Sequence, residues 1–268
     1  MITGGLRTHG ITKKSTDEKP LITVVTVVYN GEATLEQTIQ SVVNQSYDNV
    51  EYIIVDGGSK DGTIDIIKKY ENKIDYWQSE PDAGIYDAMN NGIKLATGVW
   101  INFMNAGDIF YDSNVISNFI VNSTDIKNVD VFYGNAVALI NEKEKLQIAS
   151  EKYKDFYKGP LFRHNSAFFN LELHKKNLFQ IERKELGFAL DFKLIYDLYE
   201  NNCIFRKMNF VVVAFDINGI SNNIWKNLLY NYRIVREYHF VKSTVYFVYR
   251  NIKELLYVLV MNFFKKNT

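Results

Sequence analysis

Runs of apolar residues alternate with segments of helical spacing through the first part of this chain. The runs are rich in β-branched residues, which is typical of strands buried on both faces of a sheet. The intervening segments repeat apolar residues at three- and four-residue steps, as helices do. The predicted strands cover residues 21–28, 50–55, 74–78 and 98–104, and the predicted helices cover 34–45, 62–70 and 84–96. This alternation predicts an α/β fold with a mostly parallel central sheet and right-handed crossovers.

The second half of the chain follows a less regular pattern. A helix is expected at 113–121, a strand at 129–140, a charged loop at 141–154, an apolar segment at 162–169, a helix at 186–201 and a strand at 204–215. We interpret these elements as a mixed sheet that completes the same domain. The predicted organisation is therefore an N-terminal arm (1–20), one α/β domain (21–222) and a C-terminal appendage (223–268) that is helical.

Length and composition limit the alternatives. The chain has 268 residues, of which 47% are hydrophobic, enough for one large domain or a domain plus an appendage. A single cysteine, Cys203, excludes a disulfide framework and fits a reducing compartment. The first twenty residues lack the apolar region of a signal peptide, and no run approaches the ~20 apolar residues that span a bilayer. We expect a cytoplasmic protein.

The neutral overall charge conceals an uneven distribution. Eight basic and two acidic residues lie between Trp225 and Thr268, which leaves this tail at +6 and the rest of the chain at −6. Apolar and aromatic residues recur between the basic ones, as in amphipathic helices that lie on anionic membranes. The tail thus favours peripheral association with the inner membrane surface. Packing of the same stripe on the body, or in a homodimer, is the alternative, and no nucleic-acid partner is predicted.

Two aspartates end predicted strands of the parallel sheet. Asp56 precedes Gly57 and Gly58, and Asp108 ends the segment that begins at Val99. Ligands bind at the carboxyl edge of open α/β sheets, so these acids are candidates to read a nucleotide and to hold a metal on its diphosphate. The alternatives are an Asp56 that caps a glycine turn and an Asp108 that caps a turn or helix. The glycine-rich fingerprint of dinucleotide enzymes does not follow the first strand, which disfavours an NAD enzyme.

Three segments together resemble family 2 glycosyltransferases of the GT-A fold. They are TVVYN at 26–30, VDGGSKDGT at 55–63 and SEPDAGIYDAMNNGI at 79–93, and the likeness continues through NAGD at 105–108 to about residue 221. The third segment resembles a subgroup acting in bacterial surface polysaccharide assembly. The resemblance implies a GT-A domain that binds a nucleotide-diphosphate sugar. The motifs are specific for the family and weakly specific for the sugar.

The resemblance also implies roles for individual residues on the donor side. The implied donor-binding residues are Val27, Tyr29, Asn30, Asp56, Asp82, Gly84, Asp87, Asn90 and Asn105. Among them, Asp56 would bind the base or ribose. Asp82 and Asp87 have a second interpretation, since acidic side chains stabilise the start of a helix without any ligand.

Asp108 would be the last acid of the family's metal-binding motif. Many members carry further aspartates where this chain has Asn105 and Gly107, so Asp108 is the one strong ligand left. One carboxylate suffices when the diphosphate completes the coordination shell of Mg²⁺ or Mn²⁺. We therefore expect Mg²⁺ or Mn²⁺ as the cofactor.

Asp191 is the candidate general base, because it lies among apolar residues near a helix start, where burial raises a carboxyl pKa. The alternative is a helix-start acid paired with Lys184 or Lys193. His164 matches a histidine position of the family, where it would orient the acceptor, bind phosphate or contact the metal. The alternative is a histidine that is buried among aromatic residues and has no functional role. Arg163 is a candidate phosphate ligand or a solvated edge charge.

These assignments predict inverting transfer of a sugar from a nucleotide-diphosphate donor to a glycan acceptor, with a lipid-linked acceptor favoured. Lipopolysaccharide and capsule synthesis are the processes that such a subgroup serves. A nucleotidyltransferase is disfavoured, because no basic glycine-rich loop follows the first strand. The non-enzymatic alternative is a nucleotide-sugar-binding scaffold subunit, and the missing acids at 105 and 107 are its main support.

Overall fold

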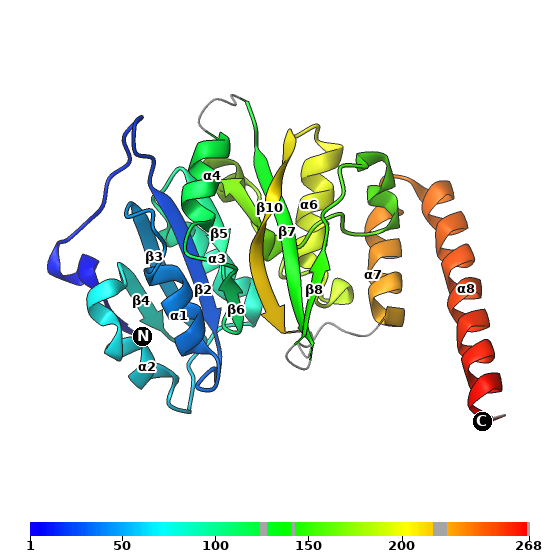
Figure 1. The fold of residues 1–268 in the computed structure, drawn as a ribbon, viewed down its shortest axis with the longest axis horizontal. Coiled ribbons are helices and arrows are strands. Elements are labelled where there is room, and N and C mark those ends of the chain that lie inside the picture. The colour runs from blue at the N-terminus through cyan, green and yellow to red at the C-terminus, as the bar shows by residue number, and fades with distance from the viewer. Residues whose placement is uncertain (124–127, 141–142, 217–223, 267–268) are drawn as a thin grey trace.

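One twisted mixed sheet organises the chain (Figure 1). The computed structural model describes residues 1–123, 128–140, 143–216 and 224–266. Its ten strands follow the order β1-β4-β3-β2-β5-β9-β7-β10-β6, and β8 pairs with β7 off this path. The predicted boundary at 222/223 lies outside the described residues.

The first half confirms the parallel arrangement that the sequence predicts. Its strands are β2 (Ile22–Val28), β3 (Val50–Asp56), β4 (Tyr76–Ser79) and β5 (Trp100–Phe103), and its helices are α1 (Leu35–Val43), α2 (Thr63–Lys69) and α3 (Ile85–Leu95). β2 is parallel to both β3 and β5, with Val28 opposite Asp56. A short 3₁₀ turn, η2 (Glu71–Lys73), precedes β4. The carboxyl ends of these strands therefore meet at one edge of the sheet.

The second half continues the sheet mainly with antiparallel strands. They are β6 (Asp108–Phe110), β7 (Val131–Ile140), β8 (Lys143–Gln147), β9 (Ala167–Asn170) and β10 (Phe205–Asp216). β9 is antiparallel to both β5 and β7, whereas β10 is parallel to β7 and antiparallel to β6. The expected mixed sheet is confirmed. The expected charged loop at 141–154 is wrong in part, because β8 forms a hairpin with β7.

Helices of the second half flank the sheet and extend beyond it. They are α4 (Val115–Ser123), α5 (Leu171–Lys176), α6 (Leu190–Glu200), α7 (Ile224–Val235) and α8 (Phe240–Lys266), with 3₁₀ turns η3 (Tyr153–Lys158), η4 (His164–Ser166) and η5 (Lys184–Leu186). α7 and α8 confirm the predicted helical appendage, and α8 lies at the end of the molecule farthest from the first strands (Figure 1). Within the described residues, we find no helix with the length and apolar content needed to traverse a bilayer.

Two apolar clusters form the core, one on each face of the sheet. α1, α2 and α4 cover one face, and α3, α5 and α6 cover the other (Figure 1). β2 supplies both clusters alternately, with Val24 in one and Val25 in the other. Helices on both faces explain why the strands read as continuous apolar runs.

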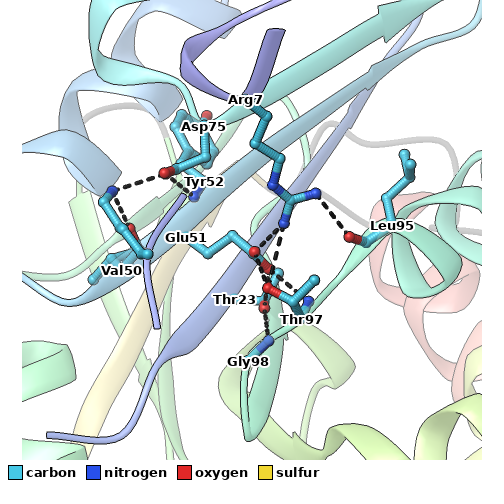
Figure 2. Close-up of polar contacts among 10 residues, drawn as sticks. Arg7, Thr23, Val50, Glu51, Tyr52, Asp75, Leu95, Thr97 and Gly98 are labelled. Atoms are coloured by element: carbon cyan, nitrogen blue, oxygen red, sulfur yellow. Dashed lines mark hydrogen bonds and ion pairs between the residues drawn. The ribbon is translucent and has the colours of Figure 1, made fainter. Parts of the chain in front are cut away.

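The first twenty residues are built into the fold, contrary to the simple arm that their polar composition predicts. β1 (Ile2–Gly4) adds an antiparallel edge strand to β4, and the 3₁₀ turn η1 (Leu6–His9) follows. Arg7 forms an ion pair with Glu51, and Lys13 Nζ lies 2.8 Å from Asp75 Oδ2 (Figure 2). Glu51 and Asp75 are only 2% and 1% exposed, so this segment supplies the countercharges of two buried acids.

Candidate functional site

Asp56 lies at the carboxyl end of β3 and is completely buried. Its Oδ2 accepts hydrogen bonds from the backbone amides of Gly58 and Ser59, both at 3.0 Å, and from the Ser79 hydroxyl at 2.6 Å. The Ser59 hydroxyl donates to Oδ1. Four donors orient this carboxylate and fix the glycine turn around it. The turn-capping interpretation therefore describes the arrangement, and base recognition by Asp56 stays a prediction.

The loops after β2 and β3 are tied to each other. Asn30, in the left-handed region with φ 51°, accepts from the Lys60 amide at 2.9 Å and donates its own amide to the Ser59 hydroxyl at 2.7 Å. The Thr63 hydroxyl accepts from the Gly31 amide at 2.9 Å. Tyr29 beside them is 64% exposed. The result is a rigid rim with one free aromatic ring, suited to a planar base.

Val27 differs from its neighbour Tyr29 in this respect. It is 5% exposed and belongs to the apolar cluster under α3. In the predicted donor site, the side chain of Val27 would therefore form a wall below the rim and not an open surface.

Three of the predicted donor residues gather at the start of α3. Asp82 Oδ1 accepts from the Gly84 amide at 2.8 Å, and Asp87 Oδ2 accepts from the Ala83 amide at 3.0 Å. Burial first, and then the charges of Asp87 and Asp56, raise the pKa of Asp82. Gly84 has φ 111°, which an L side chain adopts only with strain. Asp56, Asp82 and Asp87 thus form one acidic cluster beside a helix N-terminus.

Asn90 has a structural task that the sequence does not reveal. Its side-chain amide donates to the Phe179 carbonyl and accepts from the Phe179 amide, each at 2.9 Å. Both hydrogen-bonding groups of its side chain are thus occupied within the protein, and the residue is 5% exposed. The donor contact by Asn90 stays a prediction.

The sequence predicts that Asp108 ends the fourth strand of the parallel sheet, and the structure shows a different arrangement. β5 stops at Phe103, and Asp108 begins β6 after a turn in which Gly107 has φ 100°. The Thr38 hydroxyl of α1 accepts from the Gly107 amide at 3.0 Å and donates to the Asp108 carbonyl at 2.8 Å. The carboxyl group is still delivered to the same edge of the sheet, by a clamped turn instead of a strand end.

Arg163 lies within electrostatic range of Asp108 and Asp191. Its guanidinium stacks on Phe215 at 3.6 Å from the ring centroid, and its charge acts on both carboxyl groups. Burial raises the pKa of Asp108 to about 6, against the opposing effects of an Asn165 hydrogen bond and the Arg163 charge. The charge of one partly buried arginine thus lowers the pKa of two acids that lie far apart in the chain. The alternative of a solvated edge charge for Arg163 is disfavoured.

Asp191 lies in the first turn of α6 and is half-buried. Burial raises the pKa of its carboxyl group, while the Phe192 amide at 2.7 Å, Arg163 and Tyr86 oppose the shift. The Tyr86 hydroxyl lies 3.4 Å from Oδ1 and donates to the Phe188 carbonyl at 2.7 Å. The alternative pairing with Lys193 does not occur, because that lysine binds Asp197 at 2.5 Å. The role of Asp191 as the general base stays a prediction.

His164 is buried in an aromatic cluster with Phe103, Phe169 and Phe179. Burial lowers the pKa of its imidazole to about 3, so the ring is neutral. Its Nε2 finds no hydrogen-bond partner in the described part of the chain. The geometry matches the alternative of a histidine buried in the core. A contact of His164 with the acceptor, phosphate or metal stays a prediction.

Tyr86 and Asn165 are site residues that sequence reasoning missed. Tyr86 sits in α3, one residue from Asp87, and connects the acidic cluster to Asp191. Asn165 follows His164 and binds Asp108. The sequence contains one signal for them, because each lies next to a predicted site residue: Tyr86 next to Asp87, and Asn165 next to His164.

The oxygens near Asp108 suit a hard divalent cation. Asn105 Oδ1 and Asn165 Oδ1 are buried and have no hydrogen-bond partner among the described residues. The part of the chain that the structure describes contains no cluster of three or more His, Cys, Asp or Glu that could hold a metal alone. Asp108 with Asn105 therefore fits a Mg²⁺ or Mn²⁺ ion that also requires substrate phosphate oxygens.

Comparison with known proteins places this geometry in a family. The model of glycosyl transferase family 2 matches residues 23–211, and the chain belongs to this family. An uncharacterized glycosyltransferase of Mycobacterium tuberculosis is 38% identical over 102 residues, which are 38% of this chain and 39% of that protein. The chain thus aligns with about two fifths of the length of that relative.

Solved structures confirm the GT-A fold. A mannosyltransferase from Pyrobaculum calidifontis, in complex with GDP-Man and Mn²⁺, superposes with a TM-score of 0.62 at 16% identity and covers 86% of this chain and 68% of that one. S. aureus TarS 1-349 in complex with UDP-GlcNAc gives a TM-score of 0.61 at 17% identity, covering 81% of this chain and 66% of that one. At these identities the likeness concerns the fold.

Proposed function

We propose that this protein is an inverting glycosyltransferase that moves a sugar from a nucleotide-diphosphate donor to a hydroxyl group of a glycan acceptor. The observation that carries the proposal is that the charge of Arg163 acts on both Asp108 and Asp191, while Tyr86, beside the acidic cluster at the start of α3, lies 3.4 Å from Asp191. The region around Asp108, the first pole, suits a diphosphate with its cation. The region around Asp191, the second pole, suits removal of a proton from the acceptor.

The donor occupies the first pole. The base lies on the rim formed by the loops after β2 and β3, with Tyr29 as its stacking surface and Asp56 below. Asp108 and Asn105 would hold Mg²⁺ or Mn²⁺, and the ion would supply positive charge against the diphosphate. Arg163 adds a fixed positive charge beside Asp108, where the leaving group gathers negative charge.

The acceptor reacts at the second pole. Its hydroxyl oxygen forms a bond to the anomeric carbon while the bond from that carbon to the diphosphate oxygen breaks. Asp191 takes the hydroxyl proton, and Tyr86 keeps the Asp191 carboxyl in place. A single displacement from the opposite face inverts the anomeric configuration.

The C-terminal appendage supports a lipid-linked acceptor at the inner surface of the cytoplasmic membrane. On α8, apolar side chains at Val241, Val245, Val248, Ile252 and Leu255 are each more than half exposed. Their spacing lays them along one stripe, and basic residues flank it. This arrangement suits assembly of a surface polysaccharide such as lipopolysaccharide or capsule, with residues 21–222 acting as the catalytic domain.

A thermal-shift screen tests the donor side. UDP, GDP, CDP, dTDP and ADP are compared with and without Mn²⁺, since a ligand that binds the native state raises Tm by mass action. We expect one base to give a selective, Mn²⁺-dependent rise. Slow hydrolysis of the matching nucleotide sugar should disappear in Asp191→Asn and persist in Asp65→Asn, an exposed carboxyl on α2.

The second candidate is a nucleotide-sugar-binding scaffold, which Asn105 and Gly107 favour because they replace acidic positions. Metal-dependent nucleotide binding with no hydrolysis of any donor would support it against the enzyme. Membrane association has its own test in co-sedimentation with vesicles. Vesicles containing phosphatidylglycerol should bind the protein, vesicles of phosphatidylcholine should not, and Val245→Glu with Val248→Glu should abolish binding.

A further inference from the structure

A cleft of about 340 Å³ lies between η3 and the two C-terminal helices. Its lining includes Ser150 and Lys158 before β9, Asn231 from α7, and Tyr246 and Arg250 from α8. The volume lies in the lower part of the range of small-molecule sites in proteins. None of these residues belongs to the reaction centre, so the cleft has no role in the chemistry described above.

The charges around this cleft are balanced in pairs. Lys158 Nζ lies 2.9 Å from Asp155 Oδ1, and an Arg250 guanidinium nitrogen lies 2.7 Å from Glu254 Oε1. Each cation is thus matched by an acid on its own helical segment. A phosphate group would have to compete with these carboxylates. The cleft suits a neutral ligand better than an anion.

The remaining polar groups are those that bind sugar hydroxyls. Asn231 and Ser150 supply an amide and a hydroxyl, and Tyr246 supplies an aromatic ring. The Asn231 amide lies close to Gly159, since a Cβ atom built on that glycine would be 2.9 Å from Nδ2. Gly159 itself has φ 135°, so both space and backbone conformation call for glycine there.

One donor in the wall of the cleft has no partner. Arg250 Nε is buried and unpaired among the described residues, although its guanidinium end binds Glu254. A buried donor without a partner is unfavourable, and native structures contain few of them. This nitrogen has almost no solvent-accessible surface, so it is closed to the cleft and does not indicate an occupant.

A second cleft shares two lining residues with this one. Pro160 and Leu161 line both this cleft and a second cleft of about 300 Å³, and Arg163 and Ser166 line the second. The charge of Arg163 also acts on Asp108 and Asp191. The two clefts thus meet at Pro160 and Leu161, and the second one reaches Arg163.

We propose that the cleft between η3, α7 and α8 is a subsite for a neutral sugar of the acceptor. The acceptor is then an oligosaccharide of at least two sugars, whose growing end lies beside Asp191 and whose more distant sugar contacts Asn231 and Arg250. This inference rests on the proposed function, since it assigns the acceptor of the same reaction. It places the far end of the glycan next to the helix that carries the exposed apolar stripe.

Two asparagine variants test the subsite. Asn231→Leu replaces the amide in the cleft with an apolar group of similar size. Asn251→Leu is the matched control, because Asn251 lies on α8, is half-buried and bonds to the Phe247 carbonyl outside the cleft. Thermal unfolding of both variants shows whether each one folds.

Saturation-transfer NMR on the full chain measures binding of methyl glycosides of glucose, galactose, mannose, rhamnose and N-acetylglucosamine, with pyrophosphate as the charged probe. We expect at least one glycoside to bind wild type and Asn251→Leu equally, and to bind Asn231→Leu about fivefold or more weakly, as loss of a hydrogen-bonding group implies. The inference is overturned if no glycoside depends on Asn231, or if pyrophosphate is the probe that does.

The same samples separate this inference from the proposed function. A Mn²⁺-dependent thermal shift with a nucleotide diphosphate, combined with glycoside binding that ignores Asn231, would refute the subsite alone. Glycoside binding that depends on Asn231, in a protein that binds no nucleotide diphosphate, would refute the glycosyltransferase and leave a sugar site. With an acceptor in hand, Asn231→Leu should raise KM for an oligosaccharide and leave KM for its terminal monosaccharide unchanged.

Discussion

The Arg7–Glu51 ion pair offers a sharp test of how the N-terminal segment is integrated, and Arg7→Met is the variant that breaks it. Glu51 keeps 3% of its side chain exposed and Arg7 keeps 18%. The substitution leaves a buried carboxylate without its cation and also removes a 2.9 Å bond to the Leu95 carbonyl (Figure 2). Removing one partner of a fully buried pair costs about 3–5 kcal/mol.

Two features place the expected cost below the top of that range. Arg7 is partly solvated, and Glu51 keeps bonds from the Thr23 hydroxyl at 2.6 Å and the Thr97 amide at 2.8 Å, besides the Thr97 hydroxyl. We therefore expect the free energy of unfolding to fall by about 2–3 kcal/mol. For a chain of this length that corresponds to a Tm lower by about 5–10 °C.

Urea unfolding of four proteins completes the test. Arg206→Met, an exposed arginine on β10, should change the free energy of unfolding by less than about 0.5 kcal/mol. Arg7→Met combined with Glu51→Gln should recover part of the loss, because the variant no longer buries a net charge. The reasoning fails if Arg7→Met unfolds like wild type, or if the double variant is less stable than the single one.

Three further predictions concern the site. Burial raises the pKa of Asp191, and a base acts only when it is deprotonated. The value of kcat/KM should therefore rise with pH through that raised pKa and then level off. A profile that is flat down to pH 4 would contradict the assignment of Asp191 as the base. Asp108→Asn should weaken Mn²⁺-dependent nucleotide binding at least tenfold, read by thermal shift, with binding in EDTA unchanged. Gly84→Ala should lower the stability by about 1–2 kcal/mol in thermal unfolding, because φ 111° strains any L side chain; an unchanged Tm would show that the turn before α3 relaxes freely.

The parallel half of the sheet is predictable because its physical causes are local. Four β-branched runs separated by amphipathic segments allow few arrangements, and the structure has the one predicted. Asp56 could be placed at the end of β3 for the same reason. The family motifs added that the neighbouring segment at 79–93 lies beside it.

The remaining site depends on contacts between distant parts of the chain. The turn at Gly107, held by Thr38 of α1, moves Asp108 from the end of β5 to the start of β6, and no local pattern encodes that clamp. Arg163 comes within electrostatic range of Asp108 and Asp191 through the tertiary fold and not through any local pattern. The polar composition of residues 1–20 likewise predicts an arm, since it does not reveal the acids that Arg7 and Lys13 neutralise.

The two ends of the main strand path differ from its centre in a way that bears on solubility. Each end is a strand of only three residues, β1 at one edge and β6 at the other. Short edge strands offer few unpaired backbone groups to another molecule. Deleting residues 1–4 would uncover β4, so such a truncated protein should form oligomers through strand addition that grow with concentration, and an affinity tag that displaces β1 would carry the same risk.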